Sequence, residues 1–309
     1  MTLFKKLNNH IGWLVFLIAS FVYLSTIEQT VSFWDCGEYI ATAYKLEVGH
    51  PPGAPFFQLF GRIFSLFATQ GTSEVAVAVN ILSALCSSFT ILFLFWTITA
   101  FGKKMIFKSN VKLELGQIIA VLGSGLVGAL AYTFSDSFWF SAVEGEVYAM
   151  SSLFTAVTFW CIMKWEEEAD KPQASRWLVL IAYLIGLSVG VHLLSLLTIP
   201  AMGMIYYFKK YSYTKSGAIK AFIISMAILG IVQGVIIPGA VSLISKFELF
   251  FVNTVGLPFN YGTIIYFLAI IAIIVYGLIY TKKNNKTIWN TAILSVMMLL
   301  IGYSSFAIL

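Results

Sequence analysis

Charged residues are scarce in this chain. Asp, Glu, Lys and Arg make up only 11% of the 309 residues, whereas 59% of the residues are hydrophobic. Soluble globular domains carry about a quarter charged residues, so the composition excludes that class. The formal net charge of +5 is modest, and no nucleic-acid partner is expected. The composition instead predicts an all-α polytopic membrane protein, because long apolar runs in lipid satisfy their backbone groups as helices.

The chain also has few cysteines and lacks the common catalytic motifs. Three cysteines, Cys36, Cys86 and Cys161, give no disulfide framework, and the last two lie in apolar runs as expected of small core residues. The sequence has no Walker loop, no CxxC pair, no HExxH and no G-x-S-x-G. The usual signatures of nucleotide binding, zinc peptidases and serine hydrolases are therefore absent.

Apolar runs fill most of the chain. Seven of them are long enough to cross a bilayer: 11–27, 75–101, 118–134, 148–163, 221–237, 263–280 and 287–309. A further apolar stretch, 177–208, is too long for one span and short for two, and Gly190 and His192 interrupt its middle. We predict two short helices there, which gives about nine transmembrane helices in all, with an uncleaved first span.

The positions of the basic residues predict the orientation of these spans. With the N-terminus in the cytoplasm, all of the 19 Lys and Arg residues except Lys45, Arg62 and Lys246 lie in cytoplasmic segments, as the positive-inside rule requires. Most of the acidic residues then lie outside, together with His50 and His192. The outer acids are Glu28, Asp35, Glu38, Glu47, Glu74, Asp136, Glu144, Glu146 and Glu248. Side chains suited to chemistry therefore converge on the outer face.

The first outer loop, residues 28–74, is long and amphipathic. In 33–47 the polar residues recur at spacings of three and four: Asp35, Glu38, Thr42 and Lys45. In 55–67 a similar polar stripe faces a row of phenylalanines and isoleucine, and the sequence GHPPG at 49–53 separates the two segments. These patterns predict two helices lying in the membrane interface.

Asp35 and Glu38 are the first candidates for chemistry. They are one helical turn apart and point to the same side. Such a pair suits a general base or a ligand for a divalent cation. A structural role competes with this one, because Ser32 to Asp35 has the spacing of a capping box with Asp35 at position N3. The spacing alone leaves both alternatives open.

Glu144 and Glu146 lie in the second outer loop, residues 135–147. Ser141 and Glu144 also have capping-box spacing, whereas Glu146 has no such explanation. With neighbouring aromatic residues, Tyr148 among them, the two acids suit a sugar-binding site, because aromatic faces stack on sugar rings. An ordinary interfacial belt of aromatic residues with solvated acids explains the pattern equally well.

The histidines and the arginine of the outer side have two interpretations each. His50 precedes Pro51, which favours an extended backbone, and it can bind a phosphate, assist proton transfer or be merely solvated. His192 lies in an apolar stretch, so it is either packed and hydrogen-bonded or faces a polar cavity. Arg62 can pair with a lipid phosphate or extend its charged end to the interface without a specific partner.

Three segments together resemble a known group of proteins: FWDCGE at 33–38, GHPPGAP at 49–55 and VEGEVY at 143–148. They resemble GT-C fold glycosyltransferases, and more closely a bacterial multi-pass family grouped with animal protein O-mannosyltransferases. The resemblance covers the whole chain. It implies a single GT-C-like transmembrane domain over 1–309, forming the N-terminal part of a longer protein in the bacterial cytoplasmic membrane.

The resemblance also implies a reaction. A sugar, mannose by analogy with the family, would move with inversion from a polyprenyl-phosphate donor to a hydroxyl of a protein Ser or Thr or of a glycan. Asp35 would be the general base, with Glu38 beside it as the second catalytic residue. Substrate would be bound by His50, Arg62, Glu144, Glu146, Tyr148 and His192. No cofactor is required, although the paired carboxylates also suit a divalent cation.

Two alternatives of other classes stay open. A transporter or flippase of a lipid-linked glycan would carry charged residues deep within its spans and related halves. The spans here contain Asn80 and Gln233 but no acid, and no internal repeat is visible. A non-catalytic fragment would need residues beyond Leu309 for activity.

Overall fold

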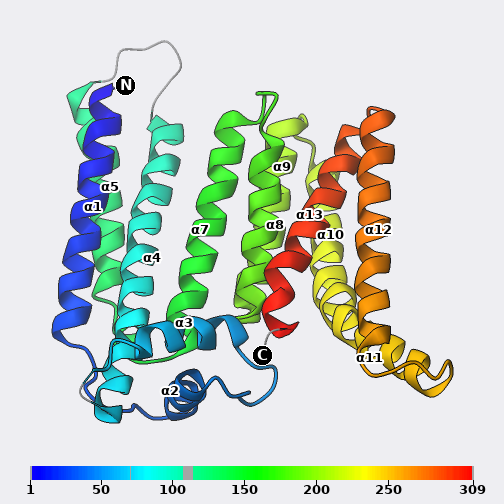
Figure 1. Cartoon of the computed structure of the whole chain (residues 1–309). Coiled ribbons are helices and arrows are strands. Elements are labelled where there is room, and N and C mark those ends of the chain that lie inside the picture. The colour runs from blue at the N-terminus through cyan, green and yellow to red at the C-terminus, as the bar shows by residue number, and fades with distance from the viewer. Residues whose placement is uncertain (1, 70, 107–113, 308–309) are drawn as a thin grey trace. The chain divides into compact units, whose positions relative to one another are not determined.

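The computed structural model describes residues 2–69, 71–106 and 114–307, and every regular element in these ranges is a helix (Figure 1). Seven of the described helices are long and apolar enough to cross a membrane. The chain is therefore an all-α polytopic membrane protein, as predicted, and the count of nine spans stays a prediction. Lys108, Lys112 and the end of the last predicted span at Leu309 lie outside the described residues.

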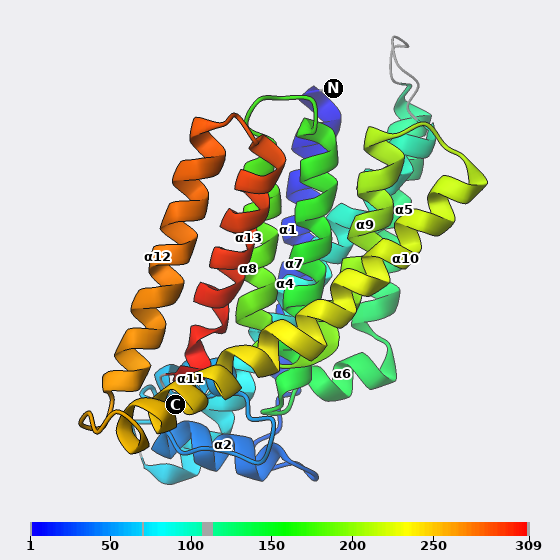
Figure 2. The same ribbon diagram turned by 90° about the vertical axis from the view of Figure 1, so that its right-hand side faces the viewer.

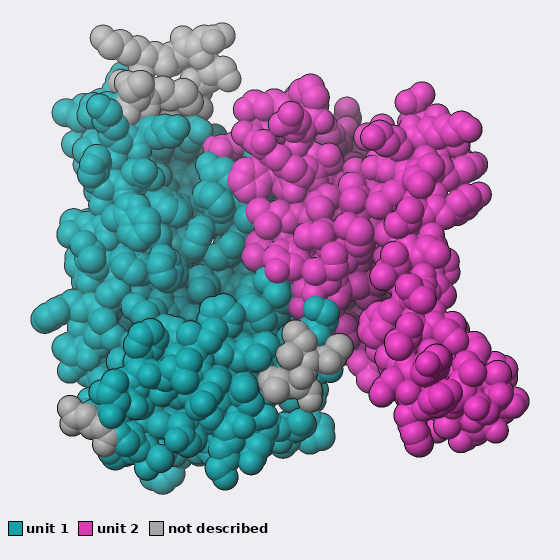
Figure 3. Space-filling model, in the orientation of Figure 1, with its two compact units in different colours: residues 1–164, 187–195, 304–309 teal, residues 165–186, 196–303 magenta. Residues whose placement is uncertain are grey.

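The chain divides into two compact units (Figure 3). The first unit comprises residues 1–164, 187–195 and 304–309, and the second comprises 165–186 and 196–303. The prediction of one transmembrane domain over the whole chain is not tested by this division. The residues that the sequence singles out for chemistry all lie in the first unit.

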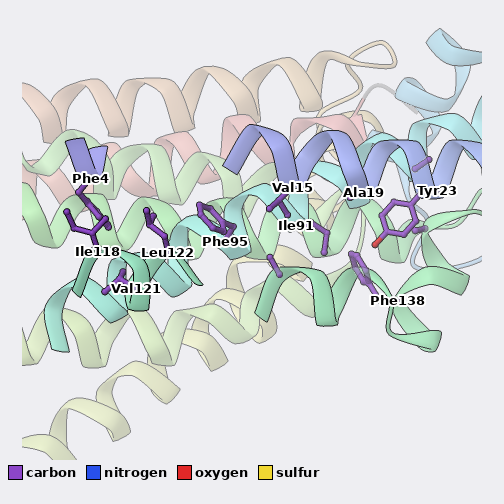
Figure 4. Close-up of a cluster of buried hydrophobic side chains, with 13 residues drawn as sticks. Phe4, Val15, Ala19, Tyr23, Ile91, Phe95, Ile118, Val121, Leu122 and Phe138 are labelled. Atoms are coloured by element: carbon purple, nitrogen blue, oxygen red, sulfur yellow. The ribbon is translucent and has the colours of Figure 1, made fainter. Parts of the chain in front are cut away.

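Long helices form the body of the first unit. They are α1 (Thr2–Ser25), α4 (Val75–Ile106), α5 (Leu115–Thr133) and α7 (Val147–Glu168), the last of which enters the second unit after Lys164. Val15 and Ala19 of α1 share a buried apolar cluster with Ile91 and Phe95 of α4 (Figure 4). The one polar group at its end is satisfied, because the Tyr23 hydroxyl donates to the Thr133 carbonyl at 3.0 Å.

Two short helices lie across one end of this unit, with α2 (Cys36–Lys45) beyond α3 (Pro55–Ser65) as seen from α4 (Figures 1 and 2). Both helices were predicted from the polar stripes, and both are confirmed. They pack closely, because a Cβ atom at Gly61 would lie 2.7 Å from the Ala43 Cβ. Buried Phe57 joins α3 to the apolar cluster that contains Val79 of α4. The described part of the first loop, residues 28–69 and 71–74, thus contains two helices packed on each other and on α4.

The other short elements of the first unit are η1 (Thr72–Glu74), α6 (Asp136–Ala142), η4 (Ser304–Ala307) and most of η2 (Leu193–Leu197). The second loop, residues 134–146, therefore holds a helix, α6, that the sequence did not predict. It ends before Glu144, so both acids of this loop follow it in the turn to α7.

The second unit begins with the apolar stretch 177–208. Two separate helices, α8 (Ser175–Val189) and α9 (Thr198–Lys210), form there with a break at residues 190–197, and the predicted division of this stretch is confirmed. The remaining helices are α10 (Lys215–Ile231), the π-helical turn η3 (Val232–Ile236), α11 (Ile237–Asn253), α12 (Tyr261–Lys283) and α13 (Thr287–Tyr303).

The helix that contains the predicted span 221–237 extends beyond residue 237. The helix continues through η3 into α11, which runs on to Asn253 and bends away from α10 (Figure 1). Pro238 occupies the first turn of α11, where a missing N–H does least harm, and a π turn of this kind accommodates such a residue within a helix. The Glu248 carboxylate of α11 then accepts the backbone N–H groups of Asn260 and Thr263 and fixes the start of α12.

The glycines of α5 give a matched test of helix packing in the first unit. A Cβ atom at Gly125 would lie 2.5 Å from Thr99 Cγ2 and 2.9 Å from Phe95 Cε2, whereas a Cβ at Gly123 would meet nothing within 4 Å. We expect Gly125→Ala to destabilise the protein by about 1–3 kcal/mol through overpacking. Gly123→Ala should be neutral or stabilising by less than about 1 kcal/mol. Thermal unfolding in detergent measures both, and equal stability of the two variants would contradict the close contact between α4 and α5.

Candidate functional site

Asp35 stands at the N-cap position of α2. The helix begins at Cys36, and the Asp35 side chain makes no capping hydrogen bond. The capping box with Asp35 at N3 is therefore wrong. The reason is the preceding residue: Trp34 has a φ of 65°, so the helix cannot begin at Ser32. The Asp35 side chain is 56% exposed, and its carboxylate is available to a ligand.

Trp34 is itself unusual. A left-handed backbone in a bulky residue costs about 1–2 kcal/mol, because the Cβ approaches the following carbonyl group. Glycine and asparagine accept this conformation more readily than tryptophan. The strained residue stands directly before the candidate base, and its ring is 90% exposed.

His50 lies between Asp35 and Glu38. Its Nδ1 is 3.0 Å from Glu38 Oε2, its backbone N–H donates to Glu38 Oε1, and its Nε2 is 3.9 Å from Asp35 Oδ2. The Glu38 carboxylate raises the pKa of His50 above its ordinary value. In return, the backbone and side-chain hydrogen bonds from His50 lower the pKa of Glu38. The first loop thus brings together three of the predicted residues as a carboxylate–imidazole–carboxylate group.

This arrangement depends on a close approach at Gly49. A Cβ atom there would lie 3.1 Å from both Gln58 Nε2 of α3 and Glu38 Oε1 of α2. Buried Gln58 in turn donates to Thr42 Oγ1 at 3.1 Å, which fixes α3 against α2. The absence of a side chain at residue 49 therefore lets the His50 N–H reach the Glu38 carboxylate.

Glu144 and Glu146 follow α6 and are both about 5% exposed. Glu144 forms no capping box with Ser141, which lies inside α6; its hydrogen-bond partners are Ser32 and Cys36 of the first loop. One carboxylate oxygen of each acid, Oε2, is buried without a hydrogen-bond partner among the described residues. Burial raises the pKa of Glu144. These acids are therefore not the solvated side chains of an interfacial belt.

Glu146 is the most perturbed acid of the site. Burial, and then the negative charges of Glu144 and Asp35, raise the pKa of Glu146 to about 7. The charge of Asp35 thus reaches Glu146, although the two residues are more than a hundred positions apart in the sequence. The first and second loops therefore bring acidic side chains close to one another, and their joint role in a substrate site stays a prediction.

The contact between the loops is organised by buried Asn80 of α4. Its Nδ2 donates to the Glu28 carbonyl at 2.8 Å and to the Thr30 carbonyl at 3.3 Å, while the Glu28 N–H donates to the Val143 carbonyl at 3.2 Å. A Cβ atom at Gly145 would lie 2.8 Å from Asn80 Oδ1. The second loop can approach α4 this closely only with glycine at 145.

Two residues of the site were not predicted from the sequence. The pKa of Tyr39 is raised to about 12 by burial and then by the charges of Glu146 and Asp35. Its ring centroid is 5.8 Å from that of His50. Cys36 is buried, and its thiol, whose pKa is raised by burial, hydrogen-bonds Glu144. Tyr39 could have been found, because it is four residues after Asp35 and shares its helix face.

His192 and Tyr148 form a second part of the site. Their ring centroids are 5.4 Å apart, and His192 Nδ1 accepts the Leu194 N–H at 3.1 Å. Burial lowers the pKa of His192, so its neutral form is favoured. The break that carries His192 is joined to the first loop, because the Gly190 carbonyl accepts the N–H of Phe56 at 2.8 Å. His192 is hence packed and hydrogen-bonded.

Arg62 is not brought to the acidic group. Its Nη1 donates to the Tyr44 carbonyl at 2.7 Å, and its guanidinium lies 5.3 Å from the centroid of the Tyr44 ring. Tyr44 is at the far end of α2 from Asp35, and a ten-residue helix is about 15 Å long. Arg62 fixes the C-terminal end of α2 to α3.

The sequence offers Asp35 and Glu38 as candidate ligands of a divalent cation. No three His, Cys, Asp or Glu side chains are grouped as metal ligands in the part of the chain that the structure describes. A divalent cation at Asp35 and Glu38 stays a prediction from the sequence.

These features define a class: a multi-pass helical membrane protein in which two loops join to form one acidic, aromatic-lined site. A family model described as the protein O-mannosyl-transferase TMEM260 N-terminal domain matches residues 35–215, more than half of the chain. The chain belongs to this family. The matched segment begins at Asp35 and contains Glu144, Glu146 and His192.

Two curated relatives are similar to the chain. The protein O-mannosyl-transferase tmem260 of Dictyostelium discoideum is 28% identical over 197 residues, which are 60% of this chain and 22% of that protein. The protein O-mannosyl-transferase TMEM260 of Mus musculus is 25% identical over 175 residues, 57% of this chain and 22% of that protein. The chain thus spans about a fifth of the length of these relatives. No solved structure matches the chain.

The buried state of Glu146 predicts a pH dependence of stability. The folded-state pKa of Glu146 is raised from 4.5 to about 7, so the folded protein favours the protonated carboxyl. Its contribution to the free energy of unfolding is fully present below about pH 4.5 and is lost as the pH rises through about 7. Glu146→Gln stays neutral, so we expect it to be more stable than the wild type above about pH 7, by up to about 3 kcal/mol. Thermal unfolding across the pH range measures the difference.

A matched control is Glu47→Gln, which changes an exposed acid of the same loop layer. It should follow the wild type at every pH. If Glu146→Gln also lost stability in parallel with the wild type as the pH rises, Glu146 would not be the buried acid responsible.

Proposed function

We propose that this chain is the membrane-embedded catalytic part of a GT-C-type glycosyltransferase. It moves mannose from a polyprenyl-phosphate donor to a Ser or Thr hydroxyl of a protein, on the outer face of a bacterial cytoplasmic membrane. The observation that carries the proposal is the hydrogen-bonded contact between the two loops, in which Cys36, next to exposed Asp35, bonds Glu144, two residues before buried Glu146. The names of both relatives, protein O-mannosyl-transferase, support the same sugar and acceptor.

Asp35 is the proposed general base. Its carboxylate takes the proton of the acceptor hydroxyl as the hydroxyl oxygen bonds to the anomeric carbon of the sugar. The bond from that carbon to the phosphate oxygen breaks, and the polyprenyl phosphate leaves with the electron pair. A single displacement of this kind inverts the anomeric centre. General-base catalysis contributes about 10²- to 10⁴-fold to such a step.

The other side chains of the site hold the substrates. Glu38 keeps His50 protonated by raising its pKa, and a cationic imidazole can stabilise the charge of the leaving phosphate. In neutral His192 the Nδ1 accepts the Leu194 N–H, so the proton lies on Nε2, which can donate to a phosphate oxygen. Arg62, at the far end of α2, is suited to a lipid phosphate at the interface rather than to the reacting one.

The second loop is suited to the sugar. Glu144 and Glu146 each have a buried carboxylate oxygen that no described residue hydrogen-bonds, and sugar hydroxyl groups are donors that would satisfy these oxygens. Tyr148 presents an exposed ring beside His192, and this ring can stack on the apolar face of the sugar. The same group of residues can therefore bind the sugar and orient it toward Asp35.

The test is Asp35→Asn in the folded protein in lipid nanodiscs. We expect the rate of mannose transfer from polyprenyl-phosphate mannose to fall by at least about 100-fold, with donor binding unchanged, because asparagine keeps the shape but cannot take a proton. Glu47→Gln, an exposed acid on the same layer, is the control and should keep full activity. Full activity of Asp35→Asn would show that another group is the base.

A further inference from the structure

Two aromatic side chains next to the proposed base are almost fully exposed. Trp34 is 90% exposed, the highest value of any large hydrophobic residue among those described, and Phe33 is 84% exposed. Exposed aromatic rings of this size are characteristic of binding surfaces, because a tryptophan contributes a large contact area and loses little conformational freedom. We call these two residues the aromatic pair.

The backbone of the aromatic pair is held in an unfavourable conformation. Trp34 has a φ of 65°, which a β-carbon disfavours and which glycine or asparagine would accept more easily. Strained residues of this kind cluster at functional sites. The chain thus carries a tryptophan at a position where the backbone alone would favour a smaller residue, and folding gives no reason for the exposed ring.

The position of the aromatic pair in the sequence places any molecule bound to it near Asp35. Trp34 directly precedes Asp35, and consecutive Cα atoms are about 3.8 Å apart. A molecule that touches the Trp34 ring is therefore within reach of the Asp35 carboxylate. The segment leads into α2, which lies beyond α3 as seen from α4 (Figure 1).

The charges around the aromatic pair indicate which kind of partner can bind there. The exposed acids of this segment are Glu28, Asp35 and Glu38, and the charge of Glu28 also reaches buried Glu144. His50 contributes one positive charge between Asp35 and Glu38, so the acids outnumber the cations beside the aromatic pair. Cationic side chains of a polypeptide would therefore be attracted and acidic ones repelled, and a Lys or Arg side chain could in addition lie over the Trp34 ring.

We propose that Phe33 and Trp34 form the binding platform for the acceptor polypeptide. The rings stack on the residues that flank the acceptor Ser or Thr, and the neighbouring acids favour a cationic flanking residue. This places the acceptor hydroxyl at Asp35, while the sugar is held by the second loop. The proposal rests on the proposed glycosyl transfer and adds to it the acceptor side of the same site.

The experiment uses Trp34→Gly, because glycine removes the ring and also relaxes the backbone, so the variant should fold. Two fluorescent peptides with one central Thr are the probes, one flanked by lysines and one by glutamates. Binding is measured without donor in lipid nanodiscs. We expect the wild type to bind the lysine-flanked peptide at least tenfold more tightly than the other, and Trp34→Gly to lose at least tenfold of that affinity.

Two further variants separate the effect of the Trp34 ring from that of removing any exposed aromatic side chain. Trp34→Tyr keeps an aromatic face and should retain most of the affinity. Phe67→Ala removes an aromatic ring that is 73% exposed in the same loop but far in sequence from Asp35, and it should bind the peptide like the wild type. Unchanged peptide affinity in Trp34→Gly, or an equal loss in Phe67→Ala, would overturn the proposal.

Catalysis gives an independent measurement. With polyprenyl-phosphate mannose, Trp34→Gly should raise the KM for the peptide while release of mannose to water stays unchanged. If release to water falls as much as transfer, the aromatic pair serves the donor or the membrane, and the proposal is wrong. If the wild type binds peptide through Trp34 but transfers no sugar, the platform stands and the proposed function fails.

Discussion

The site depends on one buried amide. Asn80 lies inside α4, and its Nδ2 donates to the carbonyl groups of Glu28 and Thr30. The Glu28 N–H then bonds to the Val143 carbonyl, and Gly145 packs against the same amide. A buried amide N–H without a partner would be costly, so the first loop is held where its carbonyl groups accept from Asn80 Nδ2. That constraint places a segment around residue 30 against one around residue 145.

Bringing the two loops together concentrates negative charge in a chain that has little charge. Most of the compensation is local, because His50 lies between Glu38 and Asp35. Backbone hydrogen bonds from Val147 and Tyr148 compensate Glu146 only in part, and burial with two neighbouring acids raises its pKa to about 7. Such perturbed groups are characteristic of functional sites, because a fold gains no stability from burying an acid beside other acids. The electrostatics and the unpartnered carboxylate oxygens thus point to a ligand rather than to a structural role.

The helices were predictable, whereas several contacts of the site were not. Run length and a spacing of three and four residues predicted α2, α3 and the division between α8 and α9, since these depend on local pattern. The extension of α11 was missed, because a π turn before Pro238 leaves no hydropathy signal. The capping roles of Asp35 and Glu144 were wrong, since spacing does not encode the backbone of Trp34 or the end of α6. The role of Asn80 in holding the loops was not predicted, because its hydrogen-bond partners are about fifty positions away in the sequence.

The environments of the two key acids separate their roles. A general base must release its proton after each turnover, and exposed Asp35 can pass that proton directly to water. Glu146 is about 5% exposed and is enclosed by other acids, so proton release from it would be slow and would increase the buried negative charge. It is better suited to accept a hydrogen bond from a bound sugar, which also satisfies its buried oxygen. Carboxylates whose surroundings differ in this way commonly divide the chemistry between them, and the same logic supports the proposal that the first loop supplies the base and the second orients the sugar.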